Sequence, residues 1–242
     1  MTLGIILLIA ILVLLFRDVI IKMFSGKKIK KLPGNKVITE EYESKQINNK
    51  QIYLDVLDTE VKVLFDNKID TIKVITSYLS EEFIYEVTDK DEILKVIKNN
   101  KNNFKNLGSS GKVLVKIPNT ATINKLNVTN SNGDIEIYDC KIDSVSLKCE
   151  SGLLKVETLD SVNTDIFKKY GDVSLNNVNV NSLKVHIDEG NADFSDVYGK
   201  DINIECLNGD FVFANVNKDY VIENFNAEIL NGKKNIDIKF IE

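Results

Sequence analysis

The chain has 242 residues, of which 43% are hydrophobic and 28% are charged, and its formal net charge at pH 7 is −5. An acidic balance, with no basic stripe beyond an N-terminal linker, argues against nucleic-acid binding. The length and apolar content suffice for one domain with its own core and a separate membrane segment.

The N-terminal segment is strongly apolar. Residues 3–16 carry no polar side chain, and the apolar character resumes after Arg17 and Asp18 as far as Phe24. A helix over residues 3–24 is about 33 Å long, which matches a hydrocarbon core of about 30 Å. The alternatives are a buried helix and a cleaved signal peptide. A signal peptide is less favoured because the segment has neither a basic start nor an Ala-x-Ala cleavage site. We predict a transmembrane anchor over residues 1–24, contacting the membrane through residues 3–24.

No basic residue precedes this segment. Basic residues lie near its C-terminal end and after it: Arg17, Lys22, Lys27, Lys28, Lys30 and Lys31. Residues 25–36 are therefore predicted to be a basic linker beside the membrane, where lysines are attracted to anionic lipid. The same asymmetry favours a cytoplasmic position for everything after the linker.

Residues 37–111 alternate between apolar and polar positions in three stretches, 50–65, 69–79 and 81–98, which are rich in Ile, Val, Tyr and Phe. Such alternation predicts strands. No regular period is visible here, so we expect irregular turns over residues 37–111. Residues 99–112 are polar and contain glycine, and we expect an exposed loop or a hairpin tip there.

From residue 112 onward a period of 19 residues dominates the sequence. Glycines recur at this spacing: Gly133, Gly152, Gly171, Gly190 and Gly209. Two apolar columns accompany them, the first formed by Ile135, Leu154, Val173, Ala192 and Phe211, the second by Ile137, Val156, Leu175, Phe194 and Phe213. A second strand follows in each unit, with Cys140, Leu159, Val178, Val197 and Val216 at an inward corner between the strands.

A unit of two short strands cannot bury its apolar face alone, but stacked units can. The predicted fold is all-β: a single-stranded parallel β-helix, or β-solenoid, with turns of about 19 residues, preceded by the transmembrane helix. The glycine supplies the positive φ angle of a tight corner. The solenoid domain is predicted over residues 37–242, with regular turns over residues 112–227 and a closing strand over residues 228–242.

Some units deviate from the 19-residue pattern, and these deviations also predict structure. Ser161, Thr164 and Lys168 weaken the inward columns of one unit. Glu223 falls on an inward column, where burying a carboxylate is costly, so we expect a bulge or register slip near residues 218–225. The closing strand would then run through Ile236, Ile238 and Phe240.

The sequence contains no recognisable catalytic, cofactor-binding or metal site, and no cofactor is expected. His186 is the only histidine, falls on an outward position and has no cysteine pair beside it. The Asp and Asn residues beside the glycines could form calcium sites, but the nine-residue calcium motif is absent and Leu153 interrupts the row. Corner capping is the favoured interpretation. A second row, Asp139, Thr158, Asn177, Asp196 and Asn215, is predicted to cap the other bend through side-chain hydrogen bonds.

Four aromatic residues fall at outward or corner positions, and for them the favoured role is covering neighbouring strands rather than stacking on sugars: Tyr138, Phe167, Tyr170 and Tyr198. The three cysteines are predicted to be free and buried. Cys149 and Cys206 share a column but lie three turns apart, beyond the reach of a disulfide.

One stretch carries a family resemblance. The passage VKIPNTATINKLNVTNSNGDIEI and the later segments GDVSL, GNADF and GDFVF resemble the bacterial DUF4097 family, also called the putative adhesin or β-strand-repeat family, over residues 45–242. The resemblance implies a β-solenoid, often tethered by an N-terminal membrane segment, with a name that suggests adhesion at the cell surface. It supplies no catalytic residues.

The leading functional hypothesis is a non-enzymatic, single-pass membrane-anchored β-solenoid of the bacterial cell envelope, an adhesin-like module that binds a polysaccharide or an envelope protein. The alternative is a membrane-associated scaffold, a bactofilin-like filament assembled end to end through exposed strands. A carbohydrate-active β-helix enzyme is less favoured because outward acids such as Glu136 and Asp193 form no matched pair. The side of the membrane is open: basic residues favour the cytoplasm, whereas the family resemblance favours the cell surface.

Overall fold

The computed structural model describes residues 37–78, 83–100, 111–215 and 222–237. This part of the chain is all-β, and its strands join into one hydrogen-bonded sheet. Within it, no helix is long and apolar enough to cross a membrane. The predicted anchor over residues 1–24 and the linker over residues 25–36 lie outside the described residues.

The strands, in chain order, are β1 (Ile38–Ser44), β2 (Lys50–Val56), β3 (Thr59–Asp66), β4 (Ile72–Tyr78), β5 (Phe83–Lys90), β6 (Ile93–Asn100), β7 (Gly111–Pro118), β8 (Ile123–Asn132), β9 (Ile135–Ser151), β10 (Leu154–Tyr170), β11 (Val173–Glu189), β12 (Ala192–Asn208), β13 (Phe211–Ala214), β14 (Asn224–Asn231) and β15 (Lys234–Asp237).

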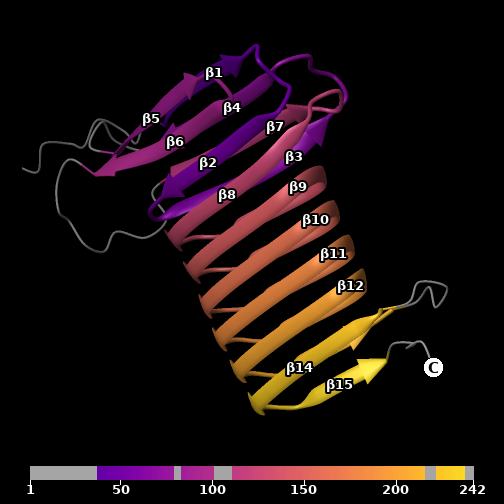
Figure 1. Cartoon of the computed structure of the whole chain (residues 1–242). Coiled ribbons are helices and arrows are strands. Elements are labelled where there is room, and N and C mark those ends of the chain that lie inside the picture. The colour runs from indigo at the N-terminus through magenta and orange to yellow at the C-terminus, as the bar shows by residue number, and fades with distance from the viewer. Residues whose placement is uncertain (1–36, 79–82, 101–110, 216–221, 238–242) are drawn as a thin grey trace, which may run out of the picture. The chain divides into compact units, whose positions relative to one another are not determined.

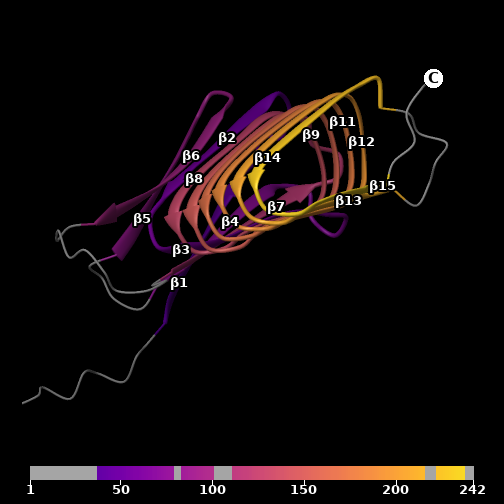
Figure 2. The same ribbon diagram turned by 90° about the horizontal axis from the view of Figure 1, so that it is seen from below.

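The strands β9 to β12 form the regular coil seen in Figure 1. They pair in parallel with a constant offset of 19 residues, so that Val156 pairs with Leu175 and Leu175 pairs with Phe194. The predicted vertical row is therefore confirmed. Each of these strands bends midway and covers two sides of a flattened coil, as the view along the stack shows (Figure 2). The β-solenoid prediction is confirmed for this part.

The predicted inward columns form the core. Ile135, Leu154, Val173, Ala192 and Phe211 are each exposed by 1% or less. Phe194, Phe211 and Phe213 pack edge-on or tilted against one another, with ring centroids 5.4 to 6.1 Å apart. Because equivalent side chains contact each other on successive turns, each turn covers the apolar face that its neighbour cannot bury alone.

Both corners of each turn use left-handed backbone conformations. At the first corner the glycines have positive φ angles, and a Cβ atom on Gly171 would lie 2.5 Å from the carbonyl oxygen of Gly152. At the second bend, Asp139, Thr158, Asn177 and Asp196 have φ angles between 50 and 59°. The sequence predicted side-chain capping for this row, and this is confirmed for Asn215, whose Oδ1 accepts from the backbone N–H of Val197 and whose Nδ2 donates to the Val197 carbonyl oxygen. The other four members contribute mainly their backbone conformation, which Asn and Asp tolerate better than most residues. The main side-chain bond between its members joins Asn177 Nδ2 to Thr158 Oγ1 at 3.3 Å.

Side chains next to the glycines cap the first corner of the following turn. Asp134 Oδ1 accepts a hydrogen bond from the backbone N–H of Leu153, and Asp172 Oδ1 accepts one from that of Asn191, both at 2.8 Å. Asn191 and Asp210 repeat the contact further down the stack. The preference for corner capping over calcium binding is thus supported by the contacts these side chains make. Leu153 offers no acceptor at the equivalent place.

This gap generates a stability prediction. Replacing Leu153 with Asn should place an acceptor next to the backbone N–H of Asp172 and raise the free energy of unfolding by about 0.5–1 kcal/mol, the usual net value of a hydrogen bond. The matched control is Asp172→Leu, which removes the acceptor one turn later and should destabilise by a similar amount. Urea denaturation of both variants checks this, and a Leu153→Asn variant less stable than the parent would contradict it.

The N-terminal part departs from a purely parallel coil. β2 and β3 pair in parallel with later strands, but β1 with β4, β4 with β7, and β5 with β6 are antiparallel. The parallel β-helix prediction is therefore wrong for these strands. For β5 and β6 the cause is local, because only Asp91 and Glu92 separate them and so short a connection permits only antiparallel pairing. The other two pairs join strands that are separated along the chain by intervening strands. Of the predicted loop over 99–112, residues 99–100 lie in β6 and residues 111–112 in β7, and the part between them lies outside the described residues.

Two buried lysines hold this N-terminal part together. Lys50 is completely buried, and its Nζ lies 2.5 Å from Asp89 Oδ1 and 3.0 Å from the carbonyl oxygen of Asp91. Lys98 Nζ donates to the carbonyl oxygens of Leu57 and Asp58, and burial lowers the pKa of Lys98 to about 8. Asp58 and Asp91 both have positive φ angles, so each lysine binds a carbonyl group of a left-handed turn.

The final turn contains an insertion. β12 pairs with β13 at an offset of 19 residues but with β14 at an offset of 23. Four extra residues thus lie between β13 and β14, where the sequence predicted a slip. Ala227 takes the inward place below Ile204, and Glu223 is exposed. Ile236 lies in β15, whereas Ile238 and Phe240 of the predicted closing strand lie outside the described residues.

Candidate functional site

One side of the coil presents regular rows of outward side chains. We call this side the ladder face: it comprises the outward residues of β8 and β14 and of the second halves of β9 to β12. Its two central rows are Lys125, Ser144, Asn163, Ser182, Asp201 and Asn224, and Asn127, Ser146, Asp165, Lys184, Asn203 and Asn226. Neighbouring members of a row are separated by the inter-strand spacing of about 4.8 Å. The face therefore repeats hydrogen-bonding groups at a fixed interval.

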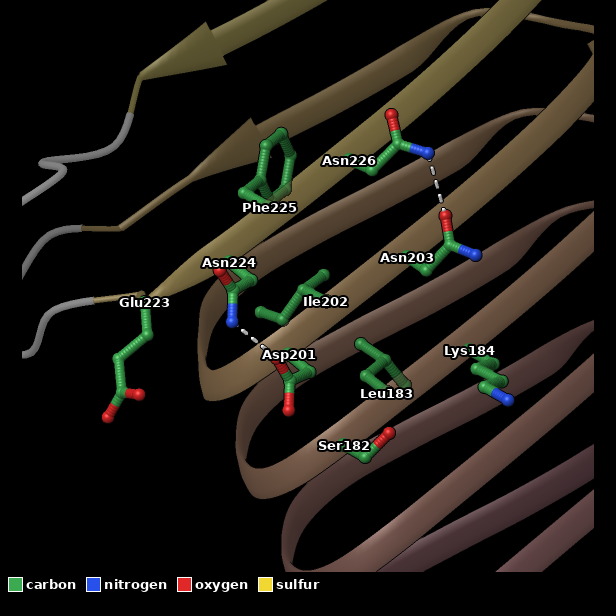
Figure 3. Close-up of a pocket in the computed structure, with 10 residues that line it drawn as sticks. All are labelled: Ser182, Leu183, Lys184, Asp201, Ile202, Asn203, Glu223, Asn224, Phe225 and Asn226. Atoms are coloured by element: carbon green, nitrogen blue, oxygen red, sulfur yellow. Dashed lines mark hydrogen bonds between the residues drawn. The ribbon is translucent and has the colours of Figure 1, made fainter.

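A groove of about 520 Å³ lies at the C-terminal end of the ladder face, across β11, β12 and β14 (Figure 3). Its polar lining consists largely of hydroxyl, amide and carboxylate groups. Asn226 Nδ2 donates to Asn203 Oδ1 at 3.0 Å, and Asn224 Nδ2 donates to Asp201 Oδ1 at 2.6 Å. Each of these amides uses one N–H in the ladder, so a second N–H and the amide oxygen remain to meet a ligand.

His186 lies beside this groove and links two turns. Its Nδ1 is 2.8 Å from Glu205 Oε2, and its Nε2 is 2.8 Å from Asp188 Oδ1. The ring stacks on Phe167 with an interplanar angle of 4° and a centroid distance of 5.2 Å. Partial burial lowers the pKa of His186, but hydrogen bonds to Glu205 and Asp188 outweigh this effect, so the pKa lies above its ordinary value. The sequence placed His186 on the outer surface, and this is confirmed by its one-third exposed side chain.

The outward aromatic residues cover their neighbours. The Lys62 Nζ lies 4.3 Å from the centre of the Tyr138 ring, and the Lys148 Nζ lies 5.7 Å from that of Phe167. Tyr198 is almost buried and donates its hydroxyl to Asp196. Tyr170 differs from the other three aromatic residues because it is 46% exposed to solvent. The preference for covering roles is confirmed for Phe167, Tyr138 and Tyr198 by these contacts.

Acidic side chains are plentiful, yet in the described ranges no three His, Cys, Asp or Glu residues are grouped so as to hold a metal ion. The three cysteines are free and buried, as predicted. Burial raises the pKa of Cys140 to about 12, and it also raises the pKa values of Cys149 and Cys206.

Sequence reasoning missed the groove because the four-residue insertion hides its last row. At a constant period of 19, Asn203 would be followed by Ile222, a buried apolar residue, whereas the structure places Asn226 there. The signal available was the series Asn224, Asn226 and Asn231, which repeats the pattern of Asp201, Asn203 and Asn208 at a spacing of 23.

The stacked turns, glycine corners and ladder face together define a β-solenoid that displays a repeating polar surface. The family model described as Toastrack DUF4097 matches residues 45–232, more than half of the chain. The chain belongs to this family, which confirms the resemblance seen in the sequence.

Of three similar solved structures, the first has a TM-score high enough to show a shared fold. A putative adhesin from Bacteroides fragilis aligns over 84% of this chain and 99% of its own, with 14% identity and a TM-score of 0.52. A putative adhesin from Parabacteroides merdae aligns over 85% of this chain and 97% of its own, with 12% identity and a TM-score of 0.41. A putative cell adhesion protein from Clostridium sporogenes aligns over 84% of this chain and 100% of its own, with 16% identity and a TM-score of 0.38. The comparison with curated proteins finds no match.

The bridge made by His186 predicts a pH-dependent stability. Because its folded pKa lies above its unfolded value of about 6.5, the bridge stabilises the protein below that pH and the contribution disappears as pH rises through the folded pKa. His186→Phe keeps a ring on Phe167 but removes the charge. The loss of unfolding free energy should be at most about 1 kcal/mol at pH 5.5 and smaller at pH 8.5, as for exposed ion pairs.

Chemical denaturation at the two pH values, with Asn176→Ala as a variant lacking any titrating group, measures this difference. A loss that grows toward pH 8.5 would show that the bridge does not work through the protonated imidazole.

Proposed function

We propose that this protein is a non-enzymatic, membrane-anchored binding module of the bacterial cell envelope, and that its ladder face binds an extended polysaccharide. The observation that carries the proposal is the groove on β11, β12 and β14, where amide, hydroxyl and carboxylate groups recur along the stack axis. A polysaccharide also repeats its hydroxyl groups along an axis. A rigid ladder meets such a ligand with little loss of conformational entropy, because its side chains are already ordered by one another.

Several features support this proposal. Toastrack DUF4097 membership and a shared fold with a putative adhesin from Bacteroides fragilis agree with a binding role. The polar lining of the groove consists of three amides, one hydroxyl, one amine and two carboxylates, and one of these carboxylates, Asp201, already accepts a hydrogen bond from Asn224. The apolar residues 3–24 would hold the module at a membrane.

Binding of envelope polysaccharide fractions to the full chain in detergent tests the ligand class. The double variant Asn203→Ala/Asn226→Ala should weaken binding about 10-fold, the effect of losing about 1.4 kcal/mol of hydrogen bonding. The double variant Asn176→Ala/Asn235→Ala makes the same chemical change on the other side of the coil and should bind like the parent protein. Equal losses in both variants, or binding only to envelope proteins, would contradict the proposal.

The proposal also requires the solenoid to lie outside the cytoplasm, although the lysines after residue 24 favour the opposite side. Protease added to intact cells, from which any outer barrier has been removed, should digest residues 37–242. Protection in intact cells combined with digestion in inverted vesicles would exclude a surface polysaccharide and leave a cytoplasmic scaffold as the better account. A cytoplasmic reporter protein that stays undigested shows that the protease has not entered the cells.

A further inference from the structure

The core of the regular coil contains one amine. Lys168 in β10 is completely buried, at a place where the equivalent residues of later turns are Ile187 and Cys206. In the same column, Asn130 and Cys149 lie on the preceding turns. Within the described part of the chain, no carboxylate lies close enough to pair with Lys168 Nζ. A buried amine without such a partner is costly, so its one polar contact is significant.

That contact is with a thiol. Lys168 Nζ lies 3.2 Å from Cys149 Sγ, and both side chains are fully buried. The same Sγ lies 3.2 Å from the carbonyl oxygen of Ser151, to which the thiol donates. The sulfur lone pairs are thereby left to the amine. The parallel pairing of β9 with β10 fixes the two side chains on adjacent turns.

We propose that peroxide converts this contact into a covalent Nζ–O–Sγ bridge between Lys168 and Cys149. An inserted oxygen atom spans the 3.2 Å gap with less movement than a direct sulfur–nitrogen bond needs. The bridge would join β9 to β10 from inside the core. It is a modification site, independent of the polysaccharide proposal.

The reaction balances with two molecules of hydrogen peroxide. The first transfers one oxygen atom to the sulfur, giving a sulfenic acid and one water. The second removes one hydrogen from the S–O–H group and one from the amine as the O–N bond forms, and it is reduced to two waters. Sulfur and nitrogen together lose four electrons, and both peroxide O–O bonds are broken.

The surroundings explain why the sulfenic acid would react with the amine. Large thiols such as glutathione cannot enter the core, whereas hydrogen peroxide is small and can enter when a turn opens locally. Burial raises the pKa of Cys149, although Lys168 opposes this effect, so the first step is expected to be slow. Once it has occurred, the amine at 3.2 Å is the group nearest to the sulfenic acid, so the second peroxide can oxidise the two together and form the O–N bond.

The chain contains its own control. Cys206 lies in the same column and is equally buried, but its neighbours on the adjacent turns are Ile187 and Ile229. It is therefore as buried as Cys149 in the folded chain and has no amine beside it. Any modification that depends on burial or on general oxidation should affect both cysteines alike.

The experiment treats the purified full chain with hydrogen peroxide, digests it without reductant and maps the peptides by mass spectrometry. The expected product is a linked pair of peptides that contain Cys149 and Lys168, about 14 Da heavier than their sum, which separates again on treatment with dithiothreitol. Linked peptides with Cys206 should be at least 10-fold rarer. Cys206→Ser should retain the bridge, and Lys168→Met, which fills the column without an amine, should lose it.

Recovery of Cys149 as a thiol, or as an oxidised residue beside an unmodified Lys168, would overturn the proposal. So would equal modification of Cys149 and Cys206. The comparison of these two cysteines within the unmutated chain decides the question even where Lys168→Met fails to fold.

Discussion

The structure depends on the close stacking of one turn on the next at its first corner. A Cβ atom on Gly209 would lie 1.9 Å from the carbonyl oxygen of Gly190, so no larger residue fits while the turns keep their spacing. This contact repeats down the stack and fixes the register of every strand that leaves the corner. The inward columns, the row of capping Asp and Asn residues and the ladder face all follow from that register.

Because the register is strict, the same side-chain contacts repeat from turn to turn. A residue that differs from the others in its column or row therefore changes the contacts at that turn. Lys168 occupies an apolar column and therefore meets Cys149. Leu153 occupies a capping row and leaves one corner without its acceptor. The four-residue insertion before β14 moves Glu223 out of the core and brings Asn226 beneath Asn203. In each case the neighbours on adjacent turns determine what the unusual residue can do.

Much of the regular coil could be predicted from the sequence because both its glycines and its apolar residues repeat at 19 positions. The need for a slip was visible in Glu223, since a carboxylate does not belong in a core column. The antiparallel pairing of β1 with β4 and of β4 with β7 could not be predicted, because no repeat relates these strands and other strands separate them along the chain. Only the pairing of β5 with β6 follows from a short local turn. The groove was hidden for a different reason: a constant period aligns Asn203 with the wrong residue. Contacts such as that of Lys168 with Cys149 require the direction of each side chain, which periodicity does not contain.

The constant offset between β9, β10, β11 and β12 has a consequence for how such proteins vary in length. Because a turn contacts mainly the turns above and below it, gaining or losing one whole unit leaves every other contact in place. The distance between the two ends of the stack would then change in steps of about 4.8 Å. Copying or deleting a single unit would therefore lengthen or shorten the stack while the remaining turns keep their pairing.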